Sequence, residues 1–230
     1  MDVRIEAAMA DEGPSSSDAR LRSLGELSAG IVHELRNALQ IIASAAYVAE
    51  QRPEHSKDEL ARIRRTTESA QRMVSDLLVL ANGLDGQSER ARLVDVVQRA
   101  REEFYGREVA WDDATLTSNI FVKGHSGLLS RLLCILYENA IQVKAPRVVA
   151  IRTTGRLEGT NFVLSVFDDG PGVAEGIAPR IFEPLVTGRD GGSGVGLALA
   201  RRIAHAHAGE IHLVVSPLGG AGFEIILPQQ

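Results

Sequence analysis

The sequence predicts an α+β protein in which a helical hairpin is followed by an α/β sandwich domain. In the first part of the chain, apolar residues recur at three- and four-residue spacing, which is typical of amphipathic helices. The second part alternates apolar helical runs with short strand-like runs. A stretch rich in glycine and polar residues separates the two parts, so we expect two domains.

The N-terminal part predicts a short tail and then the hairpin. Residues 1–20 contain Gly13, Pro14 and several serines with little apolar periodicity, and we expect a disordered tail. We expect the hairpin over residues 21–84, with Pro53 marking the break between its two helices. The apolar stripes comprise Leu24, Leu27, Ile31, Leu35, Leu39, Ile42 and Ala46 in the first helix and Leu60, Ile63, Thr67, Ala70, Val74, Leu77 and Ala81 in the second. Pairing two hairpins into a dimeric four-helix bundle would cover these stripes, so a homodimer is our hypothesis.

The C-terminal part predicts a linker and a mixed domain. We expect a linker over residues 85–92 and the second domain over 93–230. Helical patterns occur in VVQRAREEF, in residues 128–143 and in VGLALARRIAHA. Strand-like patterns occur in RVVAIRT, NFVLSVFDD, EIHLVVS and GFEIILP, and a polar GRLEGT turn joins the first two. This order favours a sandwich in which helices cover one face of a sheet.

Composition excludes several classes of protein. The net charge of -5 provides no basic excess for nucleic acid, so we expect no nucleic-acid partner. No run of eighteen apolar residues and no secretion signal occur, so we expect no membrane insertion of this chain and a cytoplasmic location. The single cysteine, Cys134, excludes an intrachain disulfide. His205, His207 and His212 have no acidic or cysteine companions, and we interpret them as surface or packing residues.

His33 is a candidate nucleophile on the first helix. At about 100° per residue it lies opposite the apolar stripe, so we expect it to face water with Asn37 on the same face. A neutral imidazole is nucleophilic near pH 7, and the adjacent Glu34 could orient it or accept its proton. Taken alone, such a histidine is more often a solvated surface residue.

Three segments of the second domain are candidate parts of a nucleotide site. In FDDGPGV, Asp168 follows an apolar strand, and Gly170 and Gly172 allow a tight turn beside a ligand, although a plain β-turn has the same pattern. Gly192, Gly194 and Gly196 precede a helix whose N-terminus could bind phosphates. Glu138 and Asn139 interrupt an apolar helix, and a metal-bound nucleotide could be their partner; a capping or surface role is the alternative. Neither a Rossmann fingerprint nor a P-loop is present.

Together these segments resemble the sensor histidine kinases of two-component signalling, over about Leu21 to Pro228. HELRN at residues 33–37 resembles the H box of that family, and LYENAIQ around Asn139 its N box. DDGPG at 168–172 resembles the G1 box, IFEPLVTGR at 181–189 the F box, and GSGVGL at 192–197 the G2 box. The five motifs occur in the order and spacing of the family.

The resemblance implies a dimeric hairpin that carries an ATP-binding domain of the Bergerat type. It implies that His33 receives the γ-phosphoryl group of ATP, that Glu34 acts as the base, and that Asn139 holds Mg²⁺. Asp168 would recognise adenine. The remaining residues assigned to the nucleotide pocket and its lid, which spans about residues 185–194, are Gly170, Gly172, Thr187, Gly192, Gly194 and Gly196.

The resemblance also implies a partner, the receiver domain of a response regulator, whose aspartate accepts the phosphoryl group. Asn37 matches the position that aligns a water for phosphatase activity toward that regulator. The chain departs from the family pattern at Ala38, where a proline is frequent, and at Ile135, where an asparagine is frequent. Two alternatives are an ATP-independent phosphotransfer adaptor with a degenerate nucleotide site and a superfamily ATPase that makes no phosphohistidine.

Overall fold

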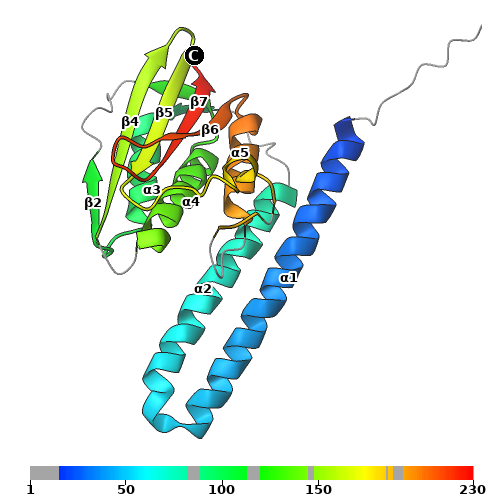
Figure 1. Cartoon of the computed structure of the whole chain (residues 1–230). Coiled ribbons are helices and arrows are strands. Elements are labelled where there is room, and N and C mark those ends of the chain that lie inside the picture. Colours follow the sequence, from blue (N-terminus) through cyan, green and yellow to red (C-terminus); the bar gives the residue numbers. More distant parts are fainter. Residues whose placement is uncertain are drawn as a thin grey trace, which may run out of the picture.

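The protein consists of a long helical hairpin and a sheet domain (Figure 1). The computed structural model describes residues 16–81, 89–112, 120–144, 148–184, 186–188 and 194–229. The α+β class predicted from the sequence is confirmed. We use "hairpin" for the first two long helices and "sheet domain" for the described residues from 89 onward.

The hairpin packs two antiparallel helices through small residues. Helix α1 (Ser16–Gln51) and helix α2 (Ser56–Ala81) are joined by the short 3₁₀ helix η1 (Pro53–His55). Ala38 and Ala45 of α1, seven residues apart, are buried. A spacing of seven residues returns to nearly the same face of a helix, so these alanines allow α2 to approach closely.

Much of the apolar surface of the hairpin is not covered within one chain. Leu39 and Tyr47 of α1 are both 65% exposed, and Leu60 of α2 is 60% exposed. Leu39 and Leu60 belong to the stripes that the sequence predicts to be buried. A single hairpin therefore leaves part of its predicted apolar surface in contact with water.

The sheet domain contains a five-stranded sheet with the order β2-β4-β5-β7-β6. Strand β2 is parallel to β4, and the other neighbours are antiparallel. A second, two-stranded sheet pairs β1 with β3. The strands are β1 (Glu89–Arg92), β2 (Val109–Asp112), β3 (Phe121–Gly124), β4 (Val149–Glu158), β5 (Asn161–Asp168), β6 (Glu210–Val215) and β7 (Ala221–Pro228). Helices α3 (Leu93–Glu102), α4 (Ser126–Lys144) and α5 (Gly196–Ala206) cover one face of the large sheet, and η2 (Ala178–Arg180) precedes α5 (Figure 1).

The core of the sheet domain lies between these helices and the large sheet. Tyr137 of α4 is fully buried, and its hydroxyl is 3.0 Å from the Thr153 hydroxyl on β4. The Tyr137 ring also packs edge-on against Trp111 of β2, with the ring centroids 4.9 Å apart. These contacts fix α4 across β2 and β4, and α4 therefore provides a rigid support for the polar residues near its C-terminal end.

Central strand β5 is buried on both faces. Its residues 162–166 are all buried, including Ser165. On the face without helices, Arg156 donates to Ser165 Oγ at 3.2 Å and forms an ion pair with Glu224 at 2.7 Å. The guanidinium thus covers Ser165, and the period-two burial expected for a strand with one solvated face does not appear in β5.

Several predicted boundaries differ from the structure. Residues 16–20, expected in the tail, already belong to α1, and residues 89–92, expected in the linker, form β1. The polar turn expected over GRLEGT is shorter, because β4 continues to Glu158 and pairs it with Asn161, leaving a two-residue turn in which Gly159 has a φ of +60°. The rest of the expected tail (residues 1–15), the end of the expected hairpin (82–84) and the first part of the expected linker (85–88) lie outside the described residues.

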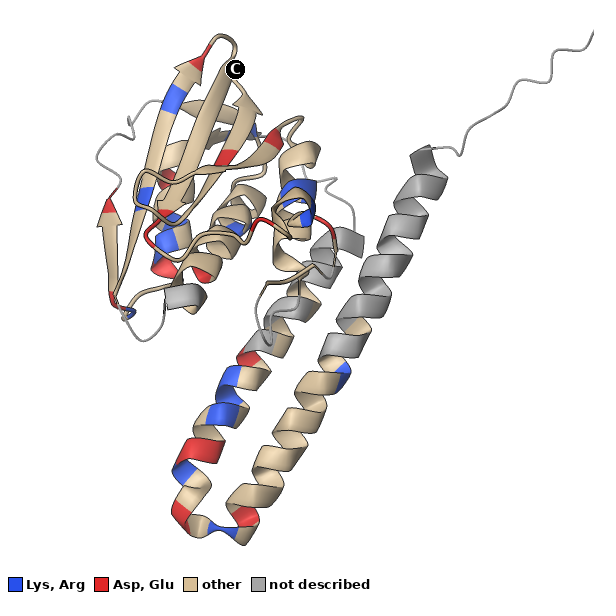
Figure 2. Cartoon of the chain, viewed as in Figure 1, with Lys and Arg blue, Asp and Glu red and all other residues tan. Residues whose placement is uncertain are grey.

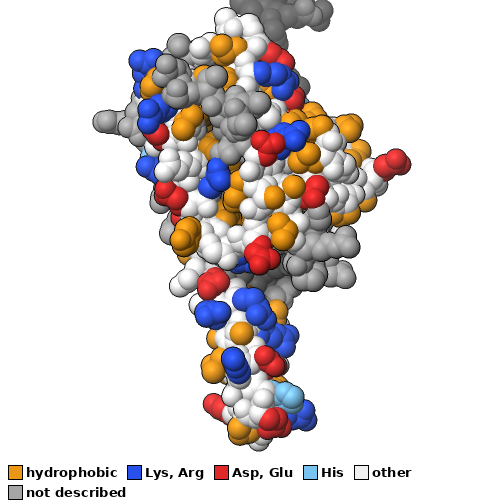
Figure 3. Space-filling view, turned by 90° about the vertical axis from the view of Figure 1, so that its left-hand side faces the viewer, with side chains coloured by type: hydrophobic (Ala, Val, Ile, Leu, Met, Phe, Trp, Pro, Cys, Tyr) orange, Lys and Arg blue, Asp and Glu red, His pale blue; other side chains and the backbone are white. Residues whose placement is uncertain are grey.

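Charges of both signs are distributed over the described surface. Figure 2 shows basic and acidic residues alternating along the hairpin, mostly on α2, and Figure 3 shows both signs of charge on its surface. Ion pairs there include Arg62 with Glu59 at 3.8 Å and Arg64 with Glu68 at 4.0 Å. A search of the described residues finds no helix that is long and apolar enough to cross a membrane.

Helix α5 ends in a Schellman motif. The Gly209 N–H donates to Ala204 O at 2.9 Å, and the Ala208 N–H donates to His205 O at 3.0 Å. The motif requires a left-handed residue between the helix and Gly209, and Ala208 has a φ of +53°. Alanine in this region costs about 1 kcal/mol, because its Cβ approaches the following carbonyl oxygen.

Ala208→Gly is expected to raise the free energy of unfolding by up to about 1 kcal/mol, because glycine removes the strain. The matched control is Ala206→Gly, an exposed position within α5, where glycine should lower stability by about 1 kcal/mol. Urea unfolding measures both. Equal destabilisation by the two substitutions would contradict the left-handed assignment.

His207 connects the end of α5 to the start of α4. Its Nδ1 lies 2.7 Å from Ile203 O and must donate, and its Nε2 accepts from the His125 backbone N–H at 3.0 Å. The ring also packs against Gly124, where a side chain would collide with it. Both nitrogens are thus engaged by the neutral ring, and burial, followed by the nearby His125, lowers the pKa of His207 from its ordinary value of 6.5.

Stability is expected to fall as the pH drops below about 6.5, because the unfolded state then binds a proton that the native His207 resists. The contribution is complete above the unfolded pKa and is lost progressively below it. His207→Leu should be less stable near neutrality but should lose less stability between about pH 7.5 and 5.5. Urea unfolding at several pH values measures this, and exposed His205→Gln is the control that should retain the wild-type pH dependence.

Candidate functional site

Asp168 ends β5 and is held in place by backbone hydrogen bonds. Its carboxylate Oδ1 accepts from the Gly170 N–H at 2.8 Å and from the Ala221 N–H at 3.1 Å. Its backbone carbonyl accepts from the Gly220 N–H at 3.1 Å and from the Ser216 hydroxyl at 2.8 Å. The side chain is buried with a defined orientation.

The turn between β6 and β7 lies directly against this carboxylate. A Cβ at Gly220 would collide with both Oδ1 and the carbonyl oxygen of Asp168. Gly172 has a φ of +76°, and a Cβ there would lie 3.6 Å from Gly220 O. Glycine at 172 and 220 therefore lets the loop after β5 and the β6–β7 turn form one wall of the site.

Asp169 anchors the same loop to the neighbouring strand. Its Oδ1 accepts from the Ala150 N–H on β4 at 2.9 Å. The two adjacent aspartates thus have different partners: Asp168 accepts hydrogen bonds from residues between β6 and β7 and at the start of β7, and Asp169 accepts one from β4. The loop is held from both sides, which positions Gly170 and Gly172.

Asn139 lies on the side of α4 that faces the start of α5. It is half-buried and stands one turn after Ile135, whose Cγ2 would lie 3.2 Å from a Cβ at Gly196. Gly196 is the first residue of α5, and Gly194 before it has a φ of +65°. The small residue at 196 allows the N-terminus of α5 to approach α4 near Asn139.

The segment before α5 is described only in part. Phe182 packs edge-on against Phe223 of β7 with ring centroids 6.2 Å apart, and Ile181 is buried. Thr187 is exposed. Gly192 and most of the predicted lid, residues 185 and 189–193, lie outside the described residues.

The candidate nucleophile lies on α1. The backbone of His33 and Glu34 is helical, and their side chains lie outside what the structure describes. Asn37, one turn later, is half-buried beside buried Ala38. The orientation of His33 and its approach to the nucleotide site therefore stay predictions.

The donor set suits a hard cation bound together with phosphates. The amide oxygen of Asn139 is a ligand type that Mg²⁺ accepts, and Mg²⁺ commonly takes only one or two protein oxygens in phosphate sites. Among the described residues no group of three or more His, Cys, Asp or Glu could hold a metal alone. A metal at this place would need the nucleotide as a ligand.

The sequence did not identify the residues that fix Asp168. These are Ser216, Gly220 and Ala221, which lie about fifty positions away and reach Asp168 only because β7 pairs with β5. The adjacent glycines of LGGA are the one signal, since they predict a turn that could approach another backbone closely. Asp169 was visible in the motif, but its role as an anchor depends on β4.

Two family models match the chain. His Kinase A (phospho-acceptor) domain matches residues 23–86, which includes α2 and most of α1. Histidine kinase-, DNA gyrase B-, and HSP90-like ATPase matches residues 124–230, which includes Asn139, Asp168 and Gly196. The second match implies that the sheet domain binds ATP.

Curated relatives of the chain are named as histidine kinases. Signal transduction histidine-protein kinase AtoS of Escherichia coli (strain K12) is 29% identical over 216 residues, covering 91% of this chain and 35% of AtoS. Sensor histidine kinase ZraS of the same strain is 30% identical, covering 91% of this chain and 46% of ZraS. The chain spans less than half the length of these relatives.

Solved structures show the same fold. The structure of histidine kinase ThkA in complex with response regulator protein TrrA superimposes with a TM-score of 0.72, covering 94% of this chain and 64% of that one at 22% identity. Acinetobacter baumannii histidine kinase AdeS gives a TM-score of 0.65, covering 86% of this chain and 98% of that one at 20% identity.

The two family models match in the expected order and span most of the chain. The phospho-acceptor model matches the hairpin, and the ATPase model matches most of the sheet domain. Asp168 and the backbone N–H groups that bind it lie within the region that matches the ATPase model. The chain therefore belongs to the two-component sensor histidine kinases, of which it comprises the catalytic core.

Proposed function

We propose that the protein uses ATP to phosphorylate its own His33 and then transfers the phosphoryl group to an aspartate in the receiver domain of a response regulator. The observation that supports this most directly is the carboxylate of Asp168, held by two backbone N–H groups within the region that matches the ATPase family. His33 lies within the region that matches the phospho-acceptor family.

Asp168 is the residue proposed to recognise adenine. A buried carboxylate with one oxygen oriented by Gly170 and Ala221 presents an acceptor to the exocyclic amine of adenine. A hydrogen bond to a charged acceptor contributes about 1.5–3 kcal/mol, and a rigid acceptor loses little freedom on binding. Gly170 and Gly172 shape the same wall.

The start of α5 is the proposed phosphate site. The first N–H groups of a helix have no partner within the helix and carry partial positive charge. Gly194 and Gly196 keep side chains away from this end, and we propose that Gly192 and Thr187 contribute to the lid over the phosphates. Asn139 would hold Mg²⁺ through its amide oxygen, and the ion would neutralise phosphate charge.

The proposed transfer is a displacement at the γ-phosphorus of ATP. A ring nitrogen of His33 forms the new N–P bond with its lone pair, while the bond from phosphorus to the β–γ bridging oxygen breaks and ADP leaves with that electron pair. The proton on the other ring nitrogen passes to Glu34, so the product is a neutral phosphorylated imidazole ring. Catalysis otherwise depends on positioning.

The receiver domain would take the phosphoryl group from His33 by attack of its aspartate. We propose that Asn37, one helical turn from His33, aligns a water molecule that removes the phosphoryl group from the regulator, which is a phosphatase activity. The solved relative ThkA binds a response regulator, which supports this class of partner. Because the reaction consumes ATP, we propose that this region acts in the cytoplasm.

The hairpin is proposed to dimerise. Leu39 and Leu60, which belong to the predicted apolar stripes, are each at least 60% exposed, and Tyr47 of α1 is 65% exposed. The phospho-acceptor family match supports the same arrangement. Two hairpins that bury these residues together would form the four-helix bundle.

The two alternatives are less well supported. A phosphotransfer adaptor without ATP use would not require the bonds that hold Asp168 against Gly170 and Ala221. An ATPase that makes no phosphohistidine would not require the hairpin with His33. Both alternatives predict that no label reaches His33.

Incubation with Mg²⁺ and γ-labelled ATP is expected to label the protein in a form that is lost in acid and stable in alkali. The label should be absent from His33→Gln, because the nucleophilic ring is missing. His55→Gln is the matched control, since His55 lies at the exposed tip of the same hairpin and should be labelled like the wild type. Acid-stable label, or label that persists in His33→Gln, would contradict the assignment.

Gly220→Ala is expected to weaken ATP binding by about tenfold or more, because the new Cβ displaces the Asp168 carboxylate. Gly176→Ala is the control, since nothing lies near a Cβ at that position. Isothermal titration calorimetry with ATP measures both variants, and circular dichroism verifies that they are folded. Unchanged ATP affinity in folded Gly220→Ala would show that Asp168 does not contact the nucleotide.

Leu39→Glu is expected to shift the protein from dimer to monomer, because a carboxylate would be buried in the proposed bundle. Leu157→Glu is the control, as Leu157 is 55% exposed on β4 of the sheet domain. Sedimentation velocity measures the change. A monomeric wild type would refute the four-helix bundle.

A further inference from the structure

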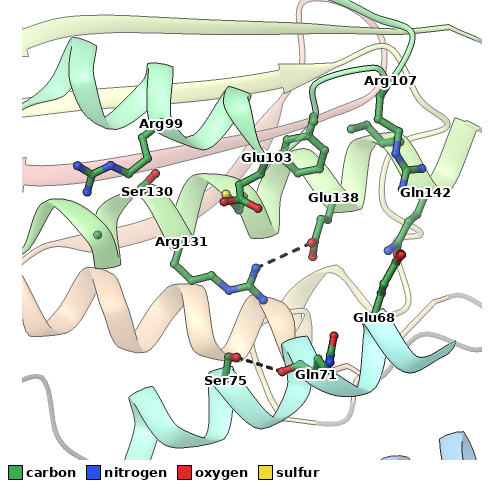
Figure 4. Close-up of a pocket in the computed structure, with 14 residues that line it drawn as sticks. Glu68, Gln71, Ser75, Arg99, Glu103, Arg107, Ser130, Arg131, Glu138 and Gln142 are labelled. Carbon is green, nitrogen blue, oxygen red and sulfur yellow. Dashed lines mark hydrogen bonds and ion pairs between the residues drawn. The ribbon is translucent and has the colours of Figure 1, made fainter. Parts of the chain in front are cut away.

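A cavity lies between the hairpin and the sheet domain, and Asp168 is not among the residues that line it. Its volume is about 500 Å³, and its walls come from α2, from α3 with the turn after it, and from α4. Pockets for small molecules in proteins are usually about 300–1,000 Å³. In Figure 4 the Arg131 guanidinium points from α4 toward α2, and Glu68 points from α2 toward Gln142.

The cavity walls carry equal numbers of positive and negative side chains. The positive groups are Arg99, Arg107 and Arg131, and the negative groups are Glu68, Glu103 and Glu138. Arg131 and Glu138 are 3.8 Å apart, which is long compared with about 2.7–2.9 Å for a charge-assisted hydrogen bond. The cavity thus holds both signs of charge within reach of one small molecule.

The equal numbers of arginine and glutamate side chains on the cavity walls favour a ligand that carries both signs of charge. A simple anion would face three carboxylates and a simple cation three guanidinium groups, and in each case the repulsion opposes the attraction. A molecule with one group of each sign meets a complementary partner at both ends. Phe104 and Ile141 add an apolar surface for a short aliphatic or aromatic group.

Cys134 also lines the cavity but does not offer a covalent site. Its thiol is buried, lies 3.7 Å from Ala100 O as a donor, and has its pKa raised by burial to about 12. A thiol with this pKa is almost entirely protonated at neutral pH and is a poor nucleophile. Binding in the cavity is therefore non-covalent.

We propose that this cavity is a binding site for a zwitterionic α-amino acid. The carboxylate of the ligand would lie at Arg107 and its ammonium group toward Glu68, both of which lie on the Gln142 side of the cavity in Figure 4, while Arg131 stays paired with Glu138. Because Glu68, Gln71 and Ser75 belong to α2 and the other charged groups belong to the sheet domain, the ligand contacts both parts of the chain. Occupancy therefore favours the arrangement in which the hairpin and the sheet domain lie together.

Saturation-transfer NMR of the whole chain with a mixture of the twenty proteinogenic amino acids, each at millimolar concentration, tests the site. We expect transfer to at least one amino acid in the wild type and its loss in Arg107→Glu, which reverses the charge at the proposed carboxylate position. Ser75→Trp, which fills the cavity from α2, should abolish the same signal. Arg52→Glu, at the exposed hairpin tip, is the charge-matched control that should retain it.

Absence of transfer to every amino acid in the wild type would overturn the proposal. Transfer that persists in folded Arg107→Glu and Ser75→Trp would also overturn it, because binding would then occur elsewhere. Circular dichroism establishes folding of each variant. The site depends on neither His33 nor ATP, so its outcome is separate from that of the phosphoryl transfer.

Discussion

Asp168 joins the end of central strand β5 to the turn between β6 and β7, and the geometry of the proposed nucleotide site depends on this connection. Its backbone carbonyl is bound by Ser216 and Gly220 of that turn, and its carboxylate is bound by Gly170 and by Ala221, the first residue of β7. Asp169 ties the same loop to β4. A buried carboxylate held by backbone N–H groups needs no movement to meet a donor, which favours selective binding.

The hairpin and the sheet domain are stabilised in different ways. The sheet domain buries its apolar residues within one chain, with Tyr137 and its neighbours between α4 and the sheet. The hairpin leaves Leu39, Tyr47 and Leu60 exposed. We propose that a second copy covers that surface in a four-helix bundle, and that a small ligand in the charged cavity beside α2 influences how the two parts lie together.

The sequence predicts those parts of the fold that have strong local patterns. The hairpin, α4, α5 and the four strands β4 to β7 have clear apolar runs or periodicity and occur near their expected positions. Strand β1 has the sequence ERAR, without apolar alternation, and it forms because it pairs with β3 across about thirty residues of chain. At the site, Asp168 was predictable from its motif, whereas Ser216 and Gly220 were not, because only the pairing of β5 with β7 brings them near.

We propose that the Asp168 carboxylate accepts a hydrogen bond from the exocyclic amine of adenine. Guanine presents a carbonyl oxygen at the equivalent ring position, which a carboxylate would repel. Titration calorimetry with ATP and with GTP, in the presence of Mg²⁺, tests this most directly. We expect ATP to bind at least about tenfold more tightly than GTP, and Asp168→Asn to reduce this ratio. Equal affinity for the two nucleotides in the wild type would contradict it.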